Sequence, residues 1–247
     1  MWLLVATLLF VEAQALAQPP APLRCLERWY AARPVFRDGA WWLVLSDGRA
    51  FPYDDGRAKN GEERLARPAV KDLFSPRYQP GPIGPVTRPD DDPGRARLEA
   101  LFEVTYPKSG LARMRFLGRR IVVHERVRPA LRRVARRLAR VLRARRALWR
   151  FFQPLGGTYC ERKIAGTDRT SAHAFGIAID LNPRLSHYWR WQSAPERPVW
   201  RNRVPQVIVD AFEAEGFIWG GRWYHYDTMH FEYRPELLDP ACYPDPR

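Results

Sequence analysis

The sequence has few cysteines and no long internal apolar run. The first feature argues against a zinc finger, and the second argues against a transmembrane protein. Beyond the N-terminal segment no stretch approaches ~18 consecutive apolar residues, so no transmembrane segment is expected in the mature chain. The three cysteines, Cys25, Cys160 and Cys242, match no zinc-finger spacing. In an oxidising compartment two could pair and leave one free, and the sequence does not say which two. No internal repeat is present, so a repeat array is not expected.

The N-terminus has the features of a secretory signal. Residues 2–11 form a short apolar run, too short to span a bilayer, and Ala15-Leu16-Ala17 is the small-x-small pattern that signal peptidase cuts. We therefore predict a signal peptide over residues 1–17, with the mature chain beginning at Gln18. No Lys or Arg precedes the apolar run, so an uncleaved anchor is the alternative.

Acidic residues are scarce relative to basic ones. The chain has 41 Lys plus Arg against 27 Asp plus Glu, a formal net charge of +14. Such a balance favours anionic surroundings. An exported chain rarely meets nucleic acid, so we expect no nucleic-acid partner; peptidoglycan carboxylates, other anionic envelope polymers and lipid head groups are the candidates. The apolar fraction of 46% is enough for a core and argues against general disorder.

The chain divides into an N-terminal extension, residues 18–94, and a more regular domain, residues 95–247. Within the extension, an apolar β-type run at 41–45 is followed by the turn Ser46-Asp47-Gly48 and a second short run at 49–53, a pattern typical of a β-hairpin. The rest of the extension offers little regular structure, and its last part is rich in Pro and Gly. The predicted segments are a lead-in at 18–35, the hairpin at 41–53, a charged mixed segment at 54–75 and a loop or linker at 76–94.

The second domain alternates helices and strands. A long helix at 127–149 has a clean apolar stripe, and its other face is almost entirely arginine from Arg132 to Arg146. That face is either a docking surface for a polyanion or a solvated outer face with an arginine-rich composition. The other predicted elements are helices at 95–104 and 205–215, strands at 119–123, 175–181, 217–219 and 229–233, a strand and turn at 156–168, and an insertion loop at 184–201.

Two clusters in this domain contain the ligand set of an open catalytic zinc site. His173, Asp180 and His230 are two histidines and a carboxylate, which leave a fourth position for water. His173 and Asp180 are seven residues apart and would lie on opposite faces of one strand, so His173 must precede the strand, with Gly176 permitting a bend. The three side chains can then converge from adjacent segments around one zinc ion.

Further residues near these clusters suit amide hydrolysis. Asp227 stands three residues before His230 and is the candidate general base for a water whose pKa zinc lowers toward ~7. Arg162 is the candidate cation for the oxyanion of the tetrahedral intermediate. Ser171, Trp219 and Trp223 are candidate substrate-binding residues. Alternatively, Ser171 supports the His173 loop and the two tryptophans belong to the core.

The two clusters also resemble the M15 family of zinc peptidases, which includes D-alanyl-D-alanine carboxypeptidases, D,D-dipeptidases and L-alanyl-D-glutamate endopeptidases of bacteria and phages. The resemblance covers roughly residues 119–235. It implies that His173, Asp180 and His230 bind Zn²⁺, that Asp227 is the base and that Arg162 polarises the substrate. The motifs that carry it are Ser171-x-His173-x-x-Gly176-x-Ala178-x-Asp180, Gly216-Phe217-x-Trp219-Gly220-Gly221-x-Trp223, Asp227-x-x-His230-Phe231 and Thr158-Tyr159-x-x-Arg162.

The resemblance implies an α+β fold with a small central antiparallel sheet, helices packed on one side and the metal in a cleft on the sheet, similar to hedgehog domains and D,D-peptidases. The expected activity is that of a zinc metallopeptidase, a hydrolase that cleaves peptidoglycan stem peptides in the periplasm or cell envelope of a bacterium. We favour an endopeptidase; the alternatives are a D-alanyl-D-alanine carboxypeptidase and a non-catalytic cationic envelope-binding protein. Residues 18–94 have no counterpart in the minimal catalytic core of the family.

Overall fold

The computed structural model describes residues 18–243, so the predicted signal peptide lies outside the described residues. The N-terminal region contains helix α1 (Ala21–Trp29) and an antiparallel sheet of β1 (Ala32–Arg37), β2 (Ala40–Leu45) and β3 (Ala50–Pro52). The hairpin predicted at 41–53 is confirmed as β2 and β3. The prediction of a mere lead-in at 18–35 is wrong. Pro20 is the N-cap of α1 and Pro22 stands in its first turn, where proline is tolerated, and Leu23 and Leu26 are buried on one face of the helix.

The rest of the extension packs against the second half of the chain. Helix α2 (Gly61–Ala66) is capped by Asn60, and a 3₁₀ turn follows at Val70–Phe74. Residues 76–94 form a loop without helix or strand, as predicted. Within this loop the buried Tyr78 hydroxyl donates to a Glu213 carboxylate oxygen, at 2.6 Å, and accepts from the Trp219 backbone N–H. The division into an extension and a catalytic domain stays a prediction.

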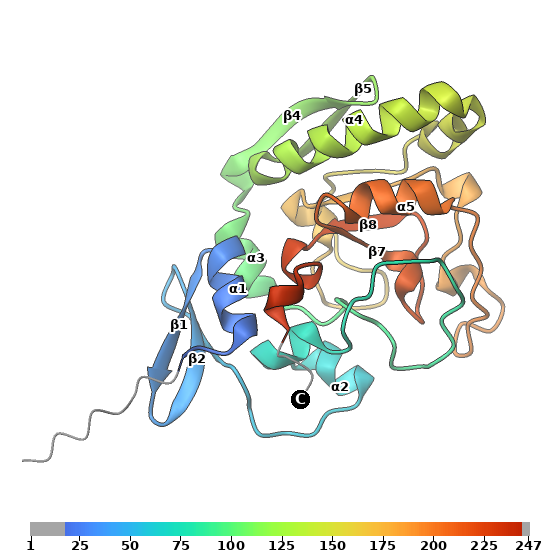
Figure 1. The fold of residues 1–247 in the computed structure, drawn as a ribbon. Coiled ribbons are helices and arrows are strands. Elements are labelled where there is room, and N and C mark those ends of the chain that lie inside the picture. Colours follow the sequence, from blue (N-terminus) through green and yellow to red (C-terminus); the bar gives the residue numbers. More distant parts are fainter. Residues whose placement is uncertain (1–17, 244–247) are drawn as a thin grey trace, which may run out of the picture.

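A helix, a β-hairpin and a second, longer helix follow the loop. Helix α3 (Glu99–Thr105) begins four residues later than predicted, and β4 (Leu111–Phe116) pairs antiparallel with β5 (Arg119–His124). The strand predicted at 119–123 is therefore confirmed, whereas β4 was missed. Helix α4 (Arg128–Ala144) is shorter than the predicted 127–149 because the chain tightens into a 3₁₀ helix at Arg146–Phe152. Figure 1 shows α4 lying along the β4–β5 hairpin at one end of the molecule.

The third sheet carries two of the three candidate ligands, Asp180 and His230. It has three antiparallel strands in the order β6 (Ala178–Asp180), β8 (His230–Tyr233) and β7 (Phe217–Trp219). Helix α5 (Gln206–Glu213), close to the predicted helix, covers one face, and its Phe212 ring stacks on Phe231 of β8 at 4.1 Å. The strand predicted at 175–181 is shorter than expected because residues Ala172–Phe175 form a 3₁₀ turn. Residues 184–201 lack α-helix and strand, as predicted for a loop.

The described residues thus form a mixed α and β structure with small antiparallel sheets, which confirms the fold class at that level. Instead of one central sheet, the described part of the chain has three separate sheets. The segment predicted as a strand at 156–168 contributes only isolated bridges, at Gly157 and Lys163. One hydrophobic core includes residues from α1, β2, α4, α5 and the third sheet. No helix in the described range 18–243 is long and apolar enough to cross a membrane.

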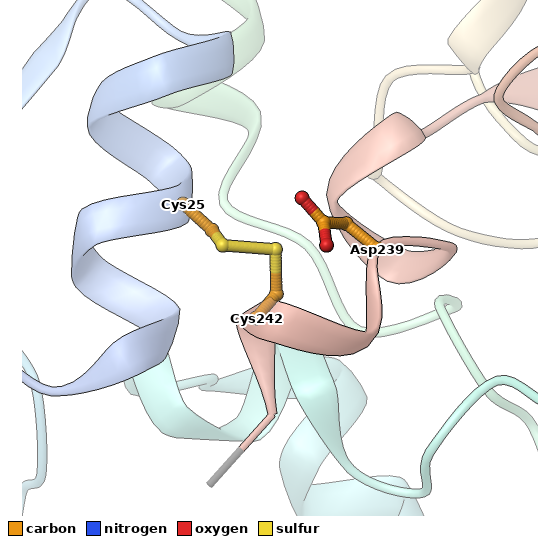
Figure 2. A group of neighbouring side chains, drawn as sticks. All are labelled: Cys25, Asp239 and Cys242. Atoms are coloured by element: carbon orange, nitrogen blue, oxygen red, sulfur yellow. A yellow bond between two sulfur atoms is a disulfide. The ribbon is translucent and has the colours of Figure 1, made fainter.

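A disulfide joins the two ends of the described chain. Cys25 of α1 is bonded to Cys242, 217 residues later, and the exposed Cys160 is the free thiol. The carboxylate of Asp239 lies beside this bond (Figure 2). The group has the residue types of a metal site, but both sulfurs are already committed to each other. It is therefore a covalent tie between α1 and the C-terminal segment rather than a ligand set.

Candidate metal centre

The three predicted ligands converge on the face of the third sheet opposite α5. Asp180 and His230 are directly paired across β6 and β8, so their side chains share one face. His173 belongs to the 3₁₀ turn before β6, and Gly176 ends that turn with a φ of +67°, the bend that the seven-residue spacing requires. A Cβ at position 176 would lie 2.7 Å from the His124 backbone nitrogen, which also restricts this position to glycine. One ligand atom from each residue lies within 4.8 Å of the other two.

The Asp180 carboxylate bridges the two imidazoles. Its Oδ2 lies 3.1 Å from His173 Nε2, and its Oδ1 lies 3.0 Å from His230 Nδ1. Burial alone would raise the pKa of Asp180, but the facing imidazoles outweigh burial and hold it below its usual range. Burial likewise opposes charge on His230, yet hydrogen bonds to Asp180 and Glu232 raise the pKa of this imidazole to about 10. The two carboxylates therefore favour a positive charge at His230, which either a proton or a metal ion can supply.

The donor set fits a zinc ion. His173 Nδ1 faces the Thr158 carbonyl oxygen, which leaves Nε2 directed toward Asp180. That Nε2 atom is buried, and although it lies 3.1 Å from Asp180 Oδ2, it makes no well-directed hydrogen bond to any described residue. In a protein a buried imidazole nitrogen without a partner is uncommon, and a metal ion would satisfy it. Two imidazole nitrogens and one carboxylate oxygen are a zinc ligand set of the catalytic type.

A buried network of charged side chains contacts the Nε2 side of His230, away from Asp180. His230 Nε2 lies 3.3 Å from Glu232 Oε2, and the same oxygen accepts a hydrogen bond from Arg97 at 2.8 Å. Glu232 also pairs with the fully buried Arg234. Despite burial, which acts in the opposite direction, these arginines and His230 lower the pKa of Glu232. A carboxylate on the second nitrogen fixes the orientation of a metal-binding histidine.

Asp227 lies in the same cleft as the three ligands. Its backbone bridges to Tyr188, and its Oδ1 accepts a weak hydrogen bond from the Met229 N–H at 3.3 Å. Burial and the nearby negative charge of Asp180 raise the pKa of Asp227 to about 7. A carboxylate with such a pKa can hold or release a proton near neutral pH, which is the property a general base needs.

The remaining predicted site residues divide into two groups. Arg162, Ser171 and Trp223 line the cleft, which has a volume of about 290 Å³. Trp223 is mostly buried, and its indole N–H donates to the Pro93 carbonyl oxygen at 2.7 Å. Trp219 does not line the cleft; it is fully buried in the core and donates to the Thr228 carbonyl oxygen. Of the two tryptophans, only Trp223 is placed to touch a substrate.

Several cleft residues were missed in the sequence. His225 hydrogen-bonds to Asp92 at 2.6 Å, so the loop before α3 supports the rim of the cleft. The alternation of β8 could have revealed Glu232, because residues two apart on a strand share a face with each other. Arg169 and His225 lie close to the motifs in sequence, whereas Arg95 and Arg97 come from a distant segment that no local pattern connects to the site. The missed charged and aromatic lining residues are Arg95, Arg97, Arg169, Tyr188, Trp189, Trp191, His225 and Glu232.

The part of the chain that contains the candidate ligands matches the model of a known protein family. Residues 165–233 match the model of an M15 peptidase family described as D-alanyl-D-alanine carboxypeptidase. Searches of curated proteins and of solved structures found no match. The matched stretch contains all three candidate ligands and Asp227, and it supports a peptidase that acts on peptidoglycan peptides. The resemblance to the M15 peptidases predicted from the sequence is therefore confirmed.

Proposed function

We propose that the protein is a zinc-dependent endopeptidase that cleaves amide bonds within peptidoglycan stem peptides. The observation that carries this proposal is the convergence of His173, Asp180 and His230 in one cleft that also contains Asp227. The proposed ligands would hold one zinc ion through His173 Nε2, an Asp180 carboxylate oxygen and His230 Nδ1. When bound, the ion would supply the positive charge that activates water and polarises the scissile carbonyl.

The protein's own groups then divide the proton transfers and the charge stabilisation. Asp227 accepts the proton of the attacking water and later delivers it to the leaving amine. Burial beside Asp180 supports this role, because it keeps the pKa of Asp227 near neutrality. Arg162 lines the same cleft, and its guanidinium forms no ion pair with any described carboxylate. It is therefore free to donate to the developing oxyanion.

Cleavage within a peptide requires room on both sides of the scissile bond. Arg162 lines the metal cleft and also a second hollow of about 610 Å³, which includes Tyr106, Lys108 and Phe175. The two hollows adjoin at this arginine, so an extended chain could continue past the site. This continuity supports the endopeptidase over an enzyme that needs only a closed pocket for a chain end.

One observation favours the alternative, a D-alanyl-D-alanine carboxypeptidase. Arg169 lines the metal cleft, and its closest carboxylate, that of Glu99, is 3.8 Å away. Burial, with the neighbouring charges of Arg97 and Arg95, lowers the pKa of this guanidinium to about 9. This positively charged part of the cleft is suited to bind the terminal carboxylate of a peptide. The family model also bears the carboxypeptidase description.

An exported protein of the bacterial periplasm or cell envelope is part of the same proposal. The disulfide between Cys25 and Cys242 supports it, because disulfides persist in oxidising compartments. Export with cleavage predicts a mature chain that begins at Gln18. N-terminal sequencing of material secreted by an expressing bacterium tests this, and a retained Met1 would instead favour the anchored form.

Mass spectrometry of digested peptidoglycan tests the activity and the bond. Purified sacculi are incubated with the protein as isolated, with chelator, and with zinc restored after chelation. New internal amino termini that need zinc would support the endopeptidase. Free D-alanine as the sole product would establish the carboxypeptidase instead. Binding to sacculi without any new terminus would favour the non-catalytic envelope-binding protein.

A further inference from the structure

The positive charge of the chain is concentrated in one continuous stretch. Fifteen of its arginines and a single acidic residue, Glu125, fall between residues 113 and 150, so this stretch carries a net charge of +14. The whole chain also carries +14, and therefore the remainder is balanced between acids and bases. An arginine-rich composition alone would spread the excess over the surface. The concentration instead indicates a local use for the charge.

The fold brings this stretch together at one end of the molecule. It comprises β4, β5, α4 and the 3₁₀ helix that follows, which lie side by side in Figure 1. All but one of its arginines are exposed, the exception being half-buried Arg128. We call the exposed set the arginine surface; its members are Arg113, Arg115, Arg119, Arg120, Arg126, Arg132, Arg133, Arg136, Arg137, Arg140, Arg143, Arg145, Arg146 and Arg150.

Most of this charge has no partner within the described chain. Among residues 18–243, the ion pairs of the arginine surface are those of Arg133 and Arg137, both with Glu215. Arg115 and Arg120 face each other across the β4–β5 hairpin, and like charges in that position destabilise a sheet. Arginines four residues apart on α4, such as Arg132 and Arg136, repel each other in the same way. A partner with closely spaced negative charges would reduce the repulsion between these arginines.

A hollow at the end of α4 adds an aromatic ring to the arginine surface. Its volume is about 690 Å³, and it is lined by Leu142, Arg143, Arg146, Trp149 and Gln153. Guanidinium groups match phosphate oxygens in a bidentate fork. Tryptophan is the residue that favours the boundary between a bilayer and water. Two arginines beside a half-buried tryptophan therefore suit a phospholipid head group better than a bare polyanion.

The arginine surface and the cleft lie on different sides of the third sheet. Phe231 of β8 faces α5, which contacts α4, whereas its neighbours His230 and Glu232 face the cleft. No residue that lines the cleft falls between 113 and 150. A protein resting on its arginine surface would consequently keep the cleft open toward the opposite side.

We propose that the arginine surface docks the protein on a bilayer rich in anionic phospholipids. The apolar face of α4 is buried in the core, and none of the exposed large apolar side chains of the described residues lies in the 113–150 stretch. The helix therefore cannot insert, and binding is peripheral and electrostatic. This inference is independent of the proposed hydrolysis, although docking would turn the cleft away from the membrane.

Vesicle sedimentation tests the proposal. The protein is mixed with vesicles of phosphatidylglycerol and phosphatidylcholine, or of phosphatidylcholine alone, at low and high salt. We expect binding only to the anionic vesicles and release by salt. Replacing Arg132, Arg136, Arg140 and Arg143 with Gln should weaken the binding by about 100-fold or more, since each basic residue near such a surface contributes ~1 kcal/mol.

A matched variant controls for total charge. Arg33, Arg57, Arg67 and Arg197 are exposed, unpaired with described carboxylates and remote from the arginine surface in sequence. Their replacement with Gln removes the same charge and should weaken vesicle binding much less. Equal losses in both variants, or equal binding to neutral vesicles, would overturn the proposal. Tight binding to soluble polyphosphate without vesicle binding would assign the surface to a phosphate polymer. Circular dichroism confirms that both variants fold.

Discussion

The cleft and the arginine surface are both rich in charged side chains, but these are mostly paired in the cleft and mostly unpaired on the arginine surface. In the cleft His230 and Glu232 are buried and Asp180 is largely so, and each charge faces a partner at about hydrogen-bond distance. On the arginine surface the charges are exposed and nearly all unpaired. A buried charge depends on one specific neighbour, whereas an exposed charge acts as part of a sum. Single substitutions should therefore be severe in the cleft and mild on the arginine surface.

The largest expected effect is loss of a ligand. His173→Ala, Asp180→Ala and His230→Ala should each lose bound zinc and reduce peptide release to background, because two ligands cannot hold the ion. Metal analysis beside the sacculus digestion measures both. Arg136→Gln, on the arginine surface, is the matched control and should retain full zinc content. A ligand variant that keeps one zinc per chain would remove that residue from the site.

Asp227→Asn should separate metal binding from turnover. The amide keeps the shape and the hydrogen bond from Met229 but cannot accept a proton. We expect full zinc content and a fall in kcat of about 10²- to 10⁴-fold, the usual contribution of general acid–base catalysis. An Asp227→Asn protein with near-normal kcat would require a different base.

Arg162→Lys tests the oxyanion role. A point charge does not reproduce the planar fork of a guanidinium, so we expect kcat to fall by about 10²-fold with little change in KM. Steady-state kinetics on a soluble stem peptide separate the two constants. If KM rises while kcat is unchanged, Arg162 binds the substrate without stabilising the transition state.

Glu232→Gln should weaken zinc binding without removing a ligand. Loss of the carboxylate behind His230 should raise the zinc dissociation constant by about 10- to 100-fold. Glu236→Gln is the matched control, since Glu236 pairs with the same Arg234 but does not contact His230. Both variants should lose stability, and only the first should lose zinc affinity. Equal affinities would limit Glu232 to a structural role.

The smallest effect concerns stability of the metal-free protein. The pKa of Asp227 is raised by folding, so its charge destabilises the fold increasingly as pH rises from about 4 through about 7. Asp227→Asn should therefore be equal to the parent in stability at pH 4 and the more stable protein at pH 8. The pKa change alone corresponds to ~4 kcal/mol, and we expect ~1–2 kcal/mol because solvent screens the partly exposed carboxylate. Urea unfolding measures this. Asp180→Asn should do the reverse and destabilise the protein at pH 8, because the pKa of Asp180 is lowered.

Local sequence patterns predicted that the three candidate ligands converge, and the structure brings them together. The spacing of His173, Gly176 and Asp180 required a bend at the glycine, and the structure has it. The boundaries of β7 were also predicted correctly. In contrast, α1 was missed because its prolines and arginines concealed a short apolar stripe. Pro20 and Pro22 lie at the N-cap and in the first turn, where proline does not break a helix.

Contacts between distant segments could not be predicted in this way. The pairing of Arg97 with Glu232 spans 135 residues, and so does that of Tyr78 with Glu213. The same is true of the disulfide, whose partners were left open among three cysteines. Trp219 and Trp223 have similar local settings, yet only Trp223 reaches the cleft. Packing of the whole chain decides such placements.

The most direct test of the central claim is zinc restoration of a metal-free sample. Protein stripped with chelator is titrated with zinc while bound metal and new amino termini in digested peptidoglycan are followed together. The account predicts one zinc per chain and activity that rises in proportion to occupancy. Full release of peptide termini by the metal-free protein, or zinc binding of the same stoichiometry in a His173→Ala, His230→Ala double variant, would contradict it.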